Sequence, residues 1–266
     1  MPAALRNRMT RSKLKALLRN FLPRQVRAHR ILAGPLRGRK MVTSWYHNFS
    51  SLTGRTEPDV NSWFAKTVRE GETWLDIGAN YGYTALSLAG LVGPAGRVFA
   101  FEPKLATCGY LSETVRINGL SQIAVVPLAL GTPKFLELRQ FQTSGSMVVG
   151  FGTATGPSET VLVAELDWLW PRISGDRRLI DGIKIDVQGM ELDVLKGMKR
   201  VLTTYTPKLI VELHPGVDRD ALLDLLEGCG YCRLGMPVYD SADTLYRDNL
   251  SYAFTAQVNS MEAQTA

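Results

Sequence analysis

The segment Thr73-Trp-Leu-Asp-Ile-Gly-Ala-Asn-Tyr-Gly82 constrains the fold more than any other part of the sequence. An apolar strand pattern runs into a turn with two glycines, and a helical pattern starts directly after Gly82. This order brings backbone close to a ligand at the carboxyl end of a strand, where ligands bind in open α/β sheets. The glycine spacing differs from the Gly-x-Gly-x-x-Gly of dinucleotide-binding enzymes. Asp76, just before the first glycine, would repel phosphate and favour the ammonium group of a cofactor that carries an amino acid.

A second acid follows the next apolar run, Val98-Phe-Ala-Phe-Glu102-Pro103. At the end of a strand, the carboxylate of Glu102 can accept hydrogen bonds from both hydroxyls of an adenosine ribose. Asp76 and Glu102 together therefore predict a site for S-adenosyl-L-methionine. The residues expected to bind this cofactor are Asp76, Gly78, Asn80, Tyr83 and Glu102.

Strand and helix patterns alternate along most of the chain. We expect strands at 73–77, 98–101, 123–126, 183–187 and 209–213, and helices near 83–91, 105–118, 190–202 and 219–227. This alternation predicts an α/β fold with a Rossmann-like, doubly wound and mostly parallel sheet. Two further β segments, 135–141 and 161–166, flank a loop at 143–158 that is rich in Gly, Ser and Thr. A loop of this length is usually functional or disordered, and if it is functional we expect it to border the ligand site.

The first 40 residues carry 12 Lys and Arg and no acid, so the whole chain has a net charge of +6 although its remainder is acidic. Apolar residues recur at helical spacing over 14–22, and a β-hairpin is expected over 30–43. We therefore divide the chain into a basic leader helix and hairpin (1–45), a catalytic domain (46–255) and a frayed tail (256–266). The leader helix is expected to dock on its own domain or on a partner subunit, which leaves a homo-oligomer open. Weak contact with an anionic surface is the alternative.

Neither the apolar runs nor the cysteines indicate export. No apolar run reaches the roughly 18 residues that a membrane-spanning helix needs, and the chain is expected to be cytoplasmic. Its three cysteines are too few for a disulfide framework. Cys229 and Cys232 form a C-x-x-C pair without a second ligand pair, so we interpret them as structural thiols.

The two late strands carry polar residues on one face. Lys184 and Asp186 share a face of the fourth strand, and Glu212 and His214 share a face of the fifth, because side chains alternate along a strand. Asp186 and His214 are the expected catalytic residues, since an Asp–His pair makes a base that can take a hydroxyl proton near neutral pH. The expected substrate-binding residues are Glu57, Lys184 and Glu212.

Other roles for these residues stay open. Lys184 and Glu212 could form a structural ion pair, because buried charges need partners. Asp186 and His214 could equally serve as scaffolding. A divalent metal held by Asp186, Glu212 and His214 is conceivable, but the spacing does not demand one, and we expect none.

Four segments together resemble the FkbM-type methyltransferases. They are Asp76-Ile-Gly-Ala-Asn-Tyr-Gly82, Val98-Phe-Ala-Phe-Glu-Pro103, Ile183-Lys-Ile-Asp-Val-Gln-Gly189 with Glu191, and Pro207-Lys-Leu-Ile-Val-Glu-Leu-His214. The resemblance covers roughly residues 30–235. It implies a Rossmann-like fold and methyl transfer to a hydroxyl on a sugar, glycan or secondary metabolite. One departure is visible, since the family usually has Asp-Val-Glu-Gly where this chain has Gln188 in the third position.

The sequence therefore predicts a methyltransferase that uses S-adenosyl-L-methionine and methylates a hydroxyl of a small molecule or glycan. The first alternative is N-methylation of an amine or a nucleic acid. The chain lacks the Asn-Pro-Pro-Tyr or Asp-Pro-Pro-Tyr motif of amino-group nucleic-acid methyltransferases, and no stable nucleic-acid complex is expected. The second alternative is a binding module that kept the cofactor fold without turnover. The sequence does not name the acceptor.

Overall fold

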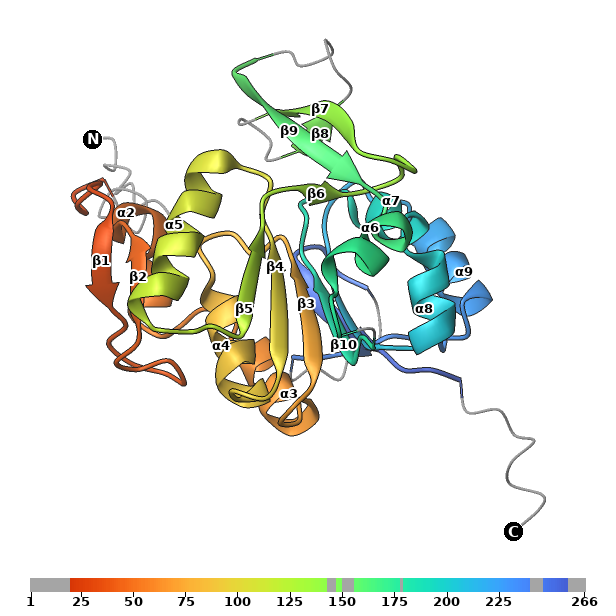
Figure 1. Cartoon of the computed structure of the whole chain (residues 1–266), viewed down its shortest axis with the longest axis horizontal. Coiled ribbons are helices and arrows are strands. Elements are labelled where there is room, and N and C mark those ends of the chain that lie inside the picture. The colour runs from red at the N-terminus through yellow and green to blue at the C-terminus, as the bar shows by residue number, and fades with distance from the viewer. Residues whose placement is uncertain (1–19, 143–146, 150–155, 178, 240–245, 258–266) are drawn as a thin grey trace, which may run out of the picture.

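A seven-stranded sheet, in the order β12-β13-β11-β10-β3-β4-β5, is the centre of the structure (Figure 1). The computed structural model describes residues 20–142, 147–149, 156–177, 179–239 and 246–257. The parallel strands are β3 (Thr73–Ile77), β4 (Arg97–Phe101), β5 (Ile123–Val126), β10 (Gly182–Ile185) and β11 (Lys208–Leu213). At one edge, β13 (Leu250–Phe254) and β12 (Met236–Pro237) run antiparallel. The predicted mostly parallel α/β sheet is confirmed.

Helices cover both faces of this sheet because the side chains of each central strand are buried in both directions. In β3, Leu75 and Ile77 pack into one apolar cluster and Trp74 packs into the other. The first cluster lies under α6 (Leu166–Ile173), α7 (Glu191–Lys196), α8 (Lys199–Tyr205) and α9 (Arg219–Gly228). The second lies under α3 (Pro58–Thr67), α4 (Tyr83–Val92) and α5 (Leu105–Ile117).

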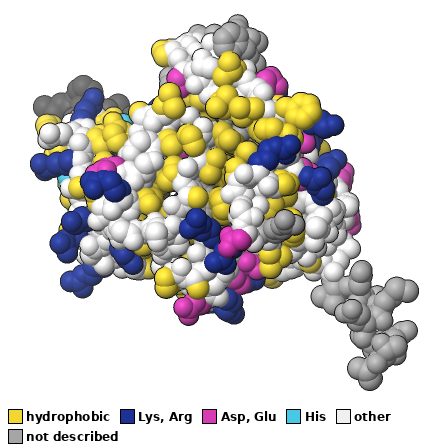
Figure 2. Space-filling view, in the orientation of Figure 1, with side chains coloured by type: hydrophobic (Ala, Val, Ile, Leu, Met, Phe, Trp, Pro, Cys, Tyr) yellow, Lys and Arg dark blue, Asp and Glu magenta, His cyan; other side chains and the backbone are white. Residues whose placement is uncertain are grey.

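The N-terminal part of the described chain forms a hairpin of β1 (Arg27–Arg30) and β2 (Lys40–Thr43), followed by α2 (Trp45–Leu52). The hairpin is attached to α5, since the N–H of Val42 donates to Thr114 Oγ1 at 2.9 Å. Lys and Arg side chains gather on this side of the molecule, and they include the exposed residues Arg24, Arg27, Arg30, Arg37, Arg39 and Lys40 (Figure 2). The expected leader helix falls mainly on residues outside the described ranges. Within the described ranges, no helix has the length and apolarity needed to cross a bilayer.

A second, four-stranded sheet interrupts the α/β alternation. Its strands are β6 (Ala129–Leu130), β7 (Glu137–Gln142), β8 (Met147–Val149) and β9 (Ser158–Ala164), in the order β6-β9-β7-β8. In Figure 1 it stands apart from the main sheet, next to α6 and α7. The predicted strand 161–166 was shifted toward the C-terminus, because β9 runs from Ser158 to Ala164 and Leu166 already begins α6.

The single helix expected over 190–202 is in fact two helices, α7 and α8, with Gly197 between them. A Cβ on Gly197 would lie 1.9 Å from the carbonyl oxygen of Gly131, so this glycine packs directly on backbone. The carboxylate of Asp167 then accepts the N–H groups of Arg200 and Val201 at 2.9 and 2.8 Å, near the start of α8. Contacts distant in sequence therefore break a helix that periodicity alone predicts as continuous.

Candidate active site

The glycine turn after β3 is tied to the strands on both sides. The N–H groups of Gly78 and Ala79 both donate to the carbonyl of Phe101, at 3.0 and 2.9 Å. Gly78 has φ +88°, and a Cβ there would lie 1.9 Å from the carbonyl oxygen of Asp186. Gly78 is thus required by strand packing as well as by its backbone conformation.

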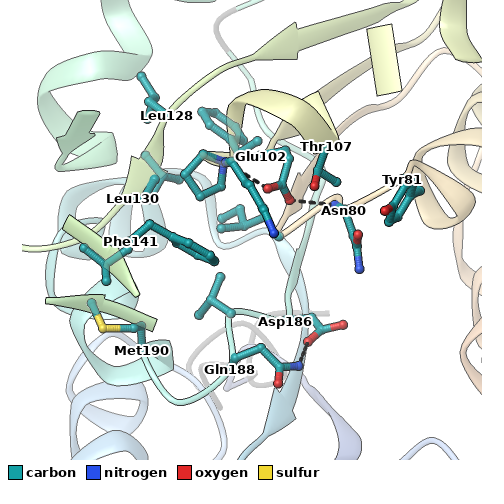
Figure 3. Close-up of a pocket in the computed structure, with 18 of the residues that line it drawn as sticks. Asn80, Tyr81, Glu102, Thr107, Leu128, Leu130, Phe141, Asp186, Gln188 and Met190 are labelled. Atoms are coloured by element: carbon teal, nitrogen blue, oxygen red, sulfur yellow. Dashed lines mark hydrogen bonds between the residues drawn. The ribbon is translucent and has the colours of Figure 1, made fainter. Parts of the chain in front are cut away.

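A cavity of about 450 Å³ opens at the carboxyl ends of β3, β4 and β10 (Figure 3), a size typical of sites for small molecules and cofactors. Figure 3 shows Glu102, Asn80 and Thr107 together in one part of the cavity, and Asp186 with Gln188 in another. The apolar residues that line it are Ile77, Phe101, Leu128, Ala129, Leu130, Phe141, Val148, Val187 and Met190. The cavity therefore combines an apolar wall with a few polar groups.

Glu102 is held in place by the backbone on both of its carboxylate oxygens. Oε2 accepts the N–H of Asn80 at 3.0 Å, and Oε1 accepts the N–H of Lys104 at 2.9 Å. Burial raises the pKa of Glu102, although these two hydrogen bonds oppose that shift. Each oxygen of a carboxylate can accept more than one hydrogen bond, so Glu102 keeps acceptor capacity toward the cavity.

Asp76 is fully buried, and neither of its carboxylate oxygens has a hydrogen-bond partner among the described residues. Burial raises its pKa to about 7, while the nearby positive charge of Lys184 opposes the shift. Asp76 is adjacent to the cavity-lining residues Ile77 and Gly78 in the chain but does not line the cavity itself. An unpaired buried carboxyl group is costly and indicates a site that is completed by a cationic group.

We expect Asp76→Asn to change how the stability of the cofactor-free protein depends on pH. The folded protein holds the Asp76 proton more tightly than the unfolded chain, because the pKa rises from 3.8 to about 7. The stabilisation from this proton is complete below the unfolded pKa and is lost as the pH rises through about 7. The variant has no such proton to lose. Its unfolding free energy relative to wild type should therefore increase by about 2 kcal/mol between about pH 5 and pH 8, which urea unfolding measures.

The control is Asp193→Asn, a change at a half-exposed carboxylate of α7. This variant should differ from wild type by the same amount at both pH values. A constant difference for Asp76→Asn as well would mean that Asp76 titrates normally in the folded protein.

Lys184 is the centre of a buried ion network. Its Nζ lies 3.0 Å from Asp186 Oδ2 and 3.6 Å from Glu57 Oε2, and the residue is 2% exposed. Burial lowers the pKa of Lys184, but the carboxylates of Asp186, Glu57 and Asp76 raise it overall, so the side chain stays charged. β10 and β11 are neighbours in the sheet and run parallel. The direct ion pairs of Lys184 are with Asp186 and Glu57, however, and not with Glu212.

His214 lies at the other end of this network. Its Nδ1 is 2.7 Å from Oε1 of Glu191, a carboxylate with no exposed surface, and its Nε2 is 2.9 Å from the side-chain nitrogen of Gln188. Nε2 is also 3.7 Å from Asp186 Oδ1 and 3.4 Å from Glu212 Oε1. Burial lowers the pKa of His214, but the bond to Glu191 and the neighbouring carboxylates raise it overall. Burial and the charge of Asp186 raise the pKa of Glu212 to about 7.

Three residues of the site have a backbone conformation that side chains other than glycine seldom adopt. Glu57, Asn80 and Gln188 have φ of 43°, 50° and 57°. Glu57 directly precedes Pro58, the first residue of α3, and its carbonyl accepts the amide of Asn61 at 2.7 Å. Backbone conformations of this kind cost free energy and persist only where the surrounding structure holds them. They are concentrated at functional sites.

The residues predicted to bind ligands fall into three groups. Gly78, Asn80, Glu102 and Asp186 line the large cavity. Glu57 and Glu212 line a separate hollow of about 140 Å³ beside β13. The remaining four, Asp76, Tyr83, Lys184 and His214, are buried behind these surfaces.

Sequence reasoning gave no role to several residues that the structure brings into the site. Glu191 was noted only within the FkbM-like segment, yet it contacts His214 directly. Phe141 and Val148 line the cavity from the second sheet, and Val148 lies within the loop that was expected to border the site. No local pattern marks these two, because they reach the cavity only through the arrangement of β7 and β8. The other residues of that loop within 143–146 and 150–155 lie outside the described ranges.

A model of the methyltransferase FkbM domain matches residues 76–232, more than half of the chain. The chain belongs to the FkbM methyltransferase family. It is an enzyme that uses S-adenosyl-L-methionine as its methyl donor.

This FkbM-family methyltransferase is similar to several known proteins. The hexuronic acid methyltransferase AglP of Haloferax volcanii is 30% identical over 179 residues, which are 65% of this chain and 68% of the relative. The methyltransferase FkbM of Methylobacillus flagellatus is 19% identical, with a TM-score of 0.47, over 77% of this chain and 52% of that one. Aeropyrum pernix fibrillarin with bound S-adenosyl-L-methionine is 14% identical, with a TM-score of 0.46, over 74% of this chain and 73% of that one.

The cavity of this FkbM-family enzyme fits S-adenosyl-L-methionine. Glu102 offers carboxylate oxygens suited to the ribose, and the apolar wall around Leu128 and Phe141 suits the adenine ring. Asp76 lies behind the cavity wall and directly precedes the lining residue Ile77. Its two carboxylate oxygens have no partner among the described residues, and their negative charge suits the ammonium of the methionine part.

Proposed function

We propose that this FkbM-family methyltransferase methylates a hydroxyl group of a sugar, a glycan or a related secondary metabolite. The observation that carries the proposal is the position of Asp186, which lines the cavity and also contacts Lys184 and His214. A relative of 30% identity is named as a methyltransferase of hexuronic acid, which supports a sugar as the acceptor class.

For the cofactor, we propose five binding residues: Asp76, Gly78, Asn80, Tyr83 and Glu102. S-adenosyl-L-methionine supplies a methyl group that its sulfonium has already activated. The protein therefore has to fix the donor and acceptor in line and exclude water. Glu102 would bind the ribose hydroxyls and Asp76 the ammonium. Tyr83 is 5% exposed, and its hydroxyl has no partner among the described residues, so it is available for a bound group.

For the acceptor, we propose that Asp186 and His214 orient the hydroxyl and remove its proton. Glu191 would hold Nδ1 of His214, which leaves Nε2 as the nitrogen that takes part in proton transfer. A positively charged donor close by would lower the pKa of His214 and favour its neutral, basic form. Lys184 would hold Asp186 in place from behind the cavity, and Glu57 and Glu212, which line the neighbouring hollow, would bind other hydroxyls of the acceptor.

The test is turnover with a panel of acceptors, measured as release of S-adenosylhomocysteine and as the mass of the product. Neutral sugars, hexuronic acids and glycans that carry them should yield a product 14 Da heavier, the mass of one added methylene, with the new methyl on oxygen. Products methylated only on the nitrogen of amines would contradict the proposal. A protein that binds the cofactor but releases no S-adenosylhomocysteine with any acceptor would support the binding module instead.

We expect Glu102→Ala to weaken S-adenosyl-L-methionine binding by about 1.5–3 kcal/mol, because hydrogen bonds to a charged group are lost. Glu102→Gln should lose less, because its side-chain oxygen and nitrogen can still make part of these hydrogen bonds. Calorimetric titration of each variant gives the affinity. Unchanged affinity in a folded Glu102→Ala variant would reject the ribose assignment.

A further inference from the structure

Three side chains at the carboxyl ends of β10 and β11, those of Asp186, Glu212 and His214, bring donor atoms close to one another. His214 Nε2 and one oxygen each of Asp186 and Glu212 all lie within 4.8 Å of one another. The separations from Nε2 are 3.7 Å to Asp186 and 3.4 Å to Glu212. Ligand atoms that are about 2.0–2.2 Å from one ion lie roughly 3–3.6 Å apart. The two separations from Nε2 are close to this spacing, and the two carboxylate oxygens, which lie within 4.8 Å of each other, can reach it by a small rotation of their side chains.

The imidazole of His214 is oriented as in a metal site. Its Nδ1 is held by Glu191, which is fully buried, and this leaves Nε2 directed at Asp186 and Glu212. Histidines that bind metals usually donate their second ring N–H to a carboxylate or carbonyl, which fixes the tautomer. His214 is itself 4% exposed, so its Nε2 is not directed at open solvent.

Gln188 adds a further potential ligand. Its side-chain nitrogen lies 2.9 Å from His214 Nε2 and 3.5 Å from Asp186 Oδ1. A rotation of the amide by half a turn would place its oxygen in the same position, and an amide oxygen is a suitable ligand for a divalent cation.

The surroundings hold more negative than positive groups. Around this space, the described residues include two groups that carry or accept positive charge, Lys184 and His214. They also include five carboxyl groups, those of Glu57, Asp76, Asp186, Glu191 and Glu212. Asp76 is fully buried with both oxygens unpartnered, and its closest charged neighbours include Lys184, Glu57 and Asp186. The ammonium of the methyl donor would offset one of these charges, and an excess would remain.

We propose that Asp186, Glu212 and His214 bind a divalent metal ion, with Gln188 as an additional oxygen ligand and Glu191 as the residue that positions His214. A set of one imidazole and two carboxylates suits a first-row ion such as Mn²⁺. The spacing along the sequence does not require a metal, and it is the meeting of the strand ends that creates the donor set. The site does not depend on the identity of the acceptor.

The location of the ion gives it a role in the reaction proposed above. Asp186 also lines the cavity, so the ion would lie next to bound donor and could coordinate an oxygen of the acceptor. It would lower the pKa of a bound hydroxyl and offset the negative charge that otherwise repels an acidic sugar. His214 would then bind the ion instead of taking the proton itself, and the proton of the acidified hydroxyl would pass to solvent water as the oxygen takes the methyl group from the donor.

The test is a direct titration with Mn²⁺. The full chain is first freed of metal with a chelator. Electron paramagnetic resonance measures the free ion. We expect one bound Mn²⁺ per chain, and a weakening of roughly 10–100-fold or more in Glu212→Gln, His214→Gln and Glu191→Gln. Glu227→Gln changes a half-exposed carboxylate of α9 and should bind as wild type does.

Two results would overturn the proposal. One is the absence of bound Mn²⁺ at millimolar concentration, and the other is binding that Glu212→Gln and His214→Gln leave unchanged. If the variants fail to fold, the wild-type complex still decides the question. Spin-echo modulation of bound Mn²⁺ should show a coupled imidazole nitrogen, and its absence would exclude His214 as a ligand. These measurements need no turnover, so they are separate from the test of the acceptor.

Discussion

Asp186→Asn and His214→Gln should each lower kcat by about 10²–10⁴-fold while the affinity for S-adenosyl-L-methionine stays close to normal. Both substitutions keep the approximate shape of the side chain and remove the charge or the basic nitrogen. Asp186 lines the cavity and contacts both Lys184 and His214, so its charge acts where the acceptor is expected. Steady-state turnover and a cofactor titration on the same preparations measure the two effects.

The matched control is Asp193→Asn, which removes a carboxylate from the exposed side of α7 and should leave kcat unchanged. Turnover near wild type in both test variants would contradict a role in the chemical step. A parallel loss of cofactor affinity would assign these residues to the donor site.

The largest expected loss of stability comes from Gly78→Ala. The added Cβ would lie 1.9 Å from the carbonyl oxygen of Asp186, and the residue has φ +88°. The left-handed conformation costs an alanine about 1–2 kcal/mol, and relief of the contact adds roughly 1–3 kcal/mol. We expect urea unfolding to show a total loss of about 2–5 kcal/mol, together with weaker cofactor binding.

Gly71→Ala separates the two causes. Gly71 has φ +84° but no atom within 4 Å of the added Cβ, so only the cost of its conformation should remain. Equal losses of unfolding free energy in Gly78→Ala and Gly71→Ala would mean that the ends of β3 and β10 can move apart near Gly78 without a measurable cost.

The central sheet could be predicted because its strands are buried on both faces and show as mostly apolar runs, interrupted by Asp76 in β3 and Lys184 in β10. β3 and β5 have the expected bounds, and β4, β10 and β11 differ from them at their ends. The antiparallel edge strand β13 was not anticipated, because Leu250–Phe254 lies outside the alternation of strands and helices and is defined by its pairing with β11. The break between α7 and α8 was missed for a similar reason, since Gly197 meets Gly131 only in the folded chain.

The candidate site could be predicted where its residues follow strands directly. Alternation predicted which of Asp186, Glu212 and His214 share a face of their strand, and the pairing of β10 with β11 brings their donor atoms within 4.8 Å. The partners of Lys184 could not be predicted, because Glu57 reaches it from the start of α3, more than a hundred residues earlier in the chain. The contact between Glu191 and His214 likewise requires the turn after β10 to fold back toward the end of β11.

The pairing of β13 with β11 sets an order in which the two halves of the site can form during synthesis. Glu212 lies opposite Ser251, and Leu209 lies opposite Phe254. The donor-binding segment from Thr73 to Leu130 is complete long before these residues emerge from the ribosome, and chains generally begin to fold from the N-terminal side. The edge of the sheet next to Glu212, by contrast, stays unpaired until Leu250 and Ser251 have emerged. A stalled nascent chain that ends before Leu250 would therefore expose β11 as an open edge, available to other unpaired strands.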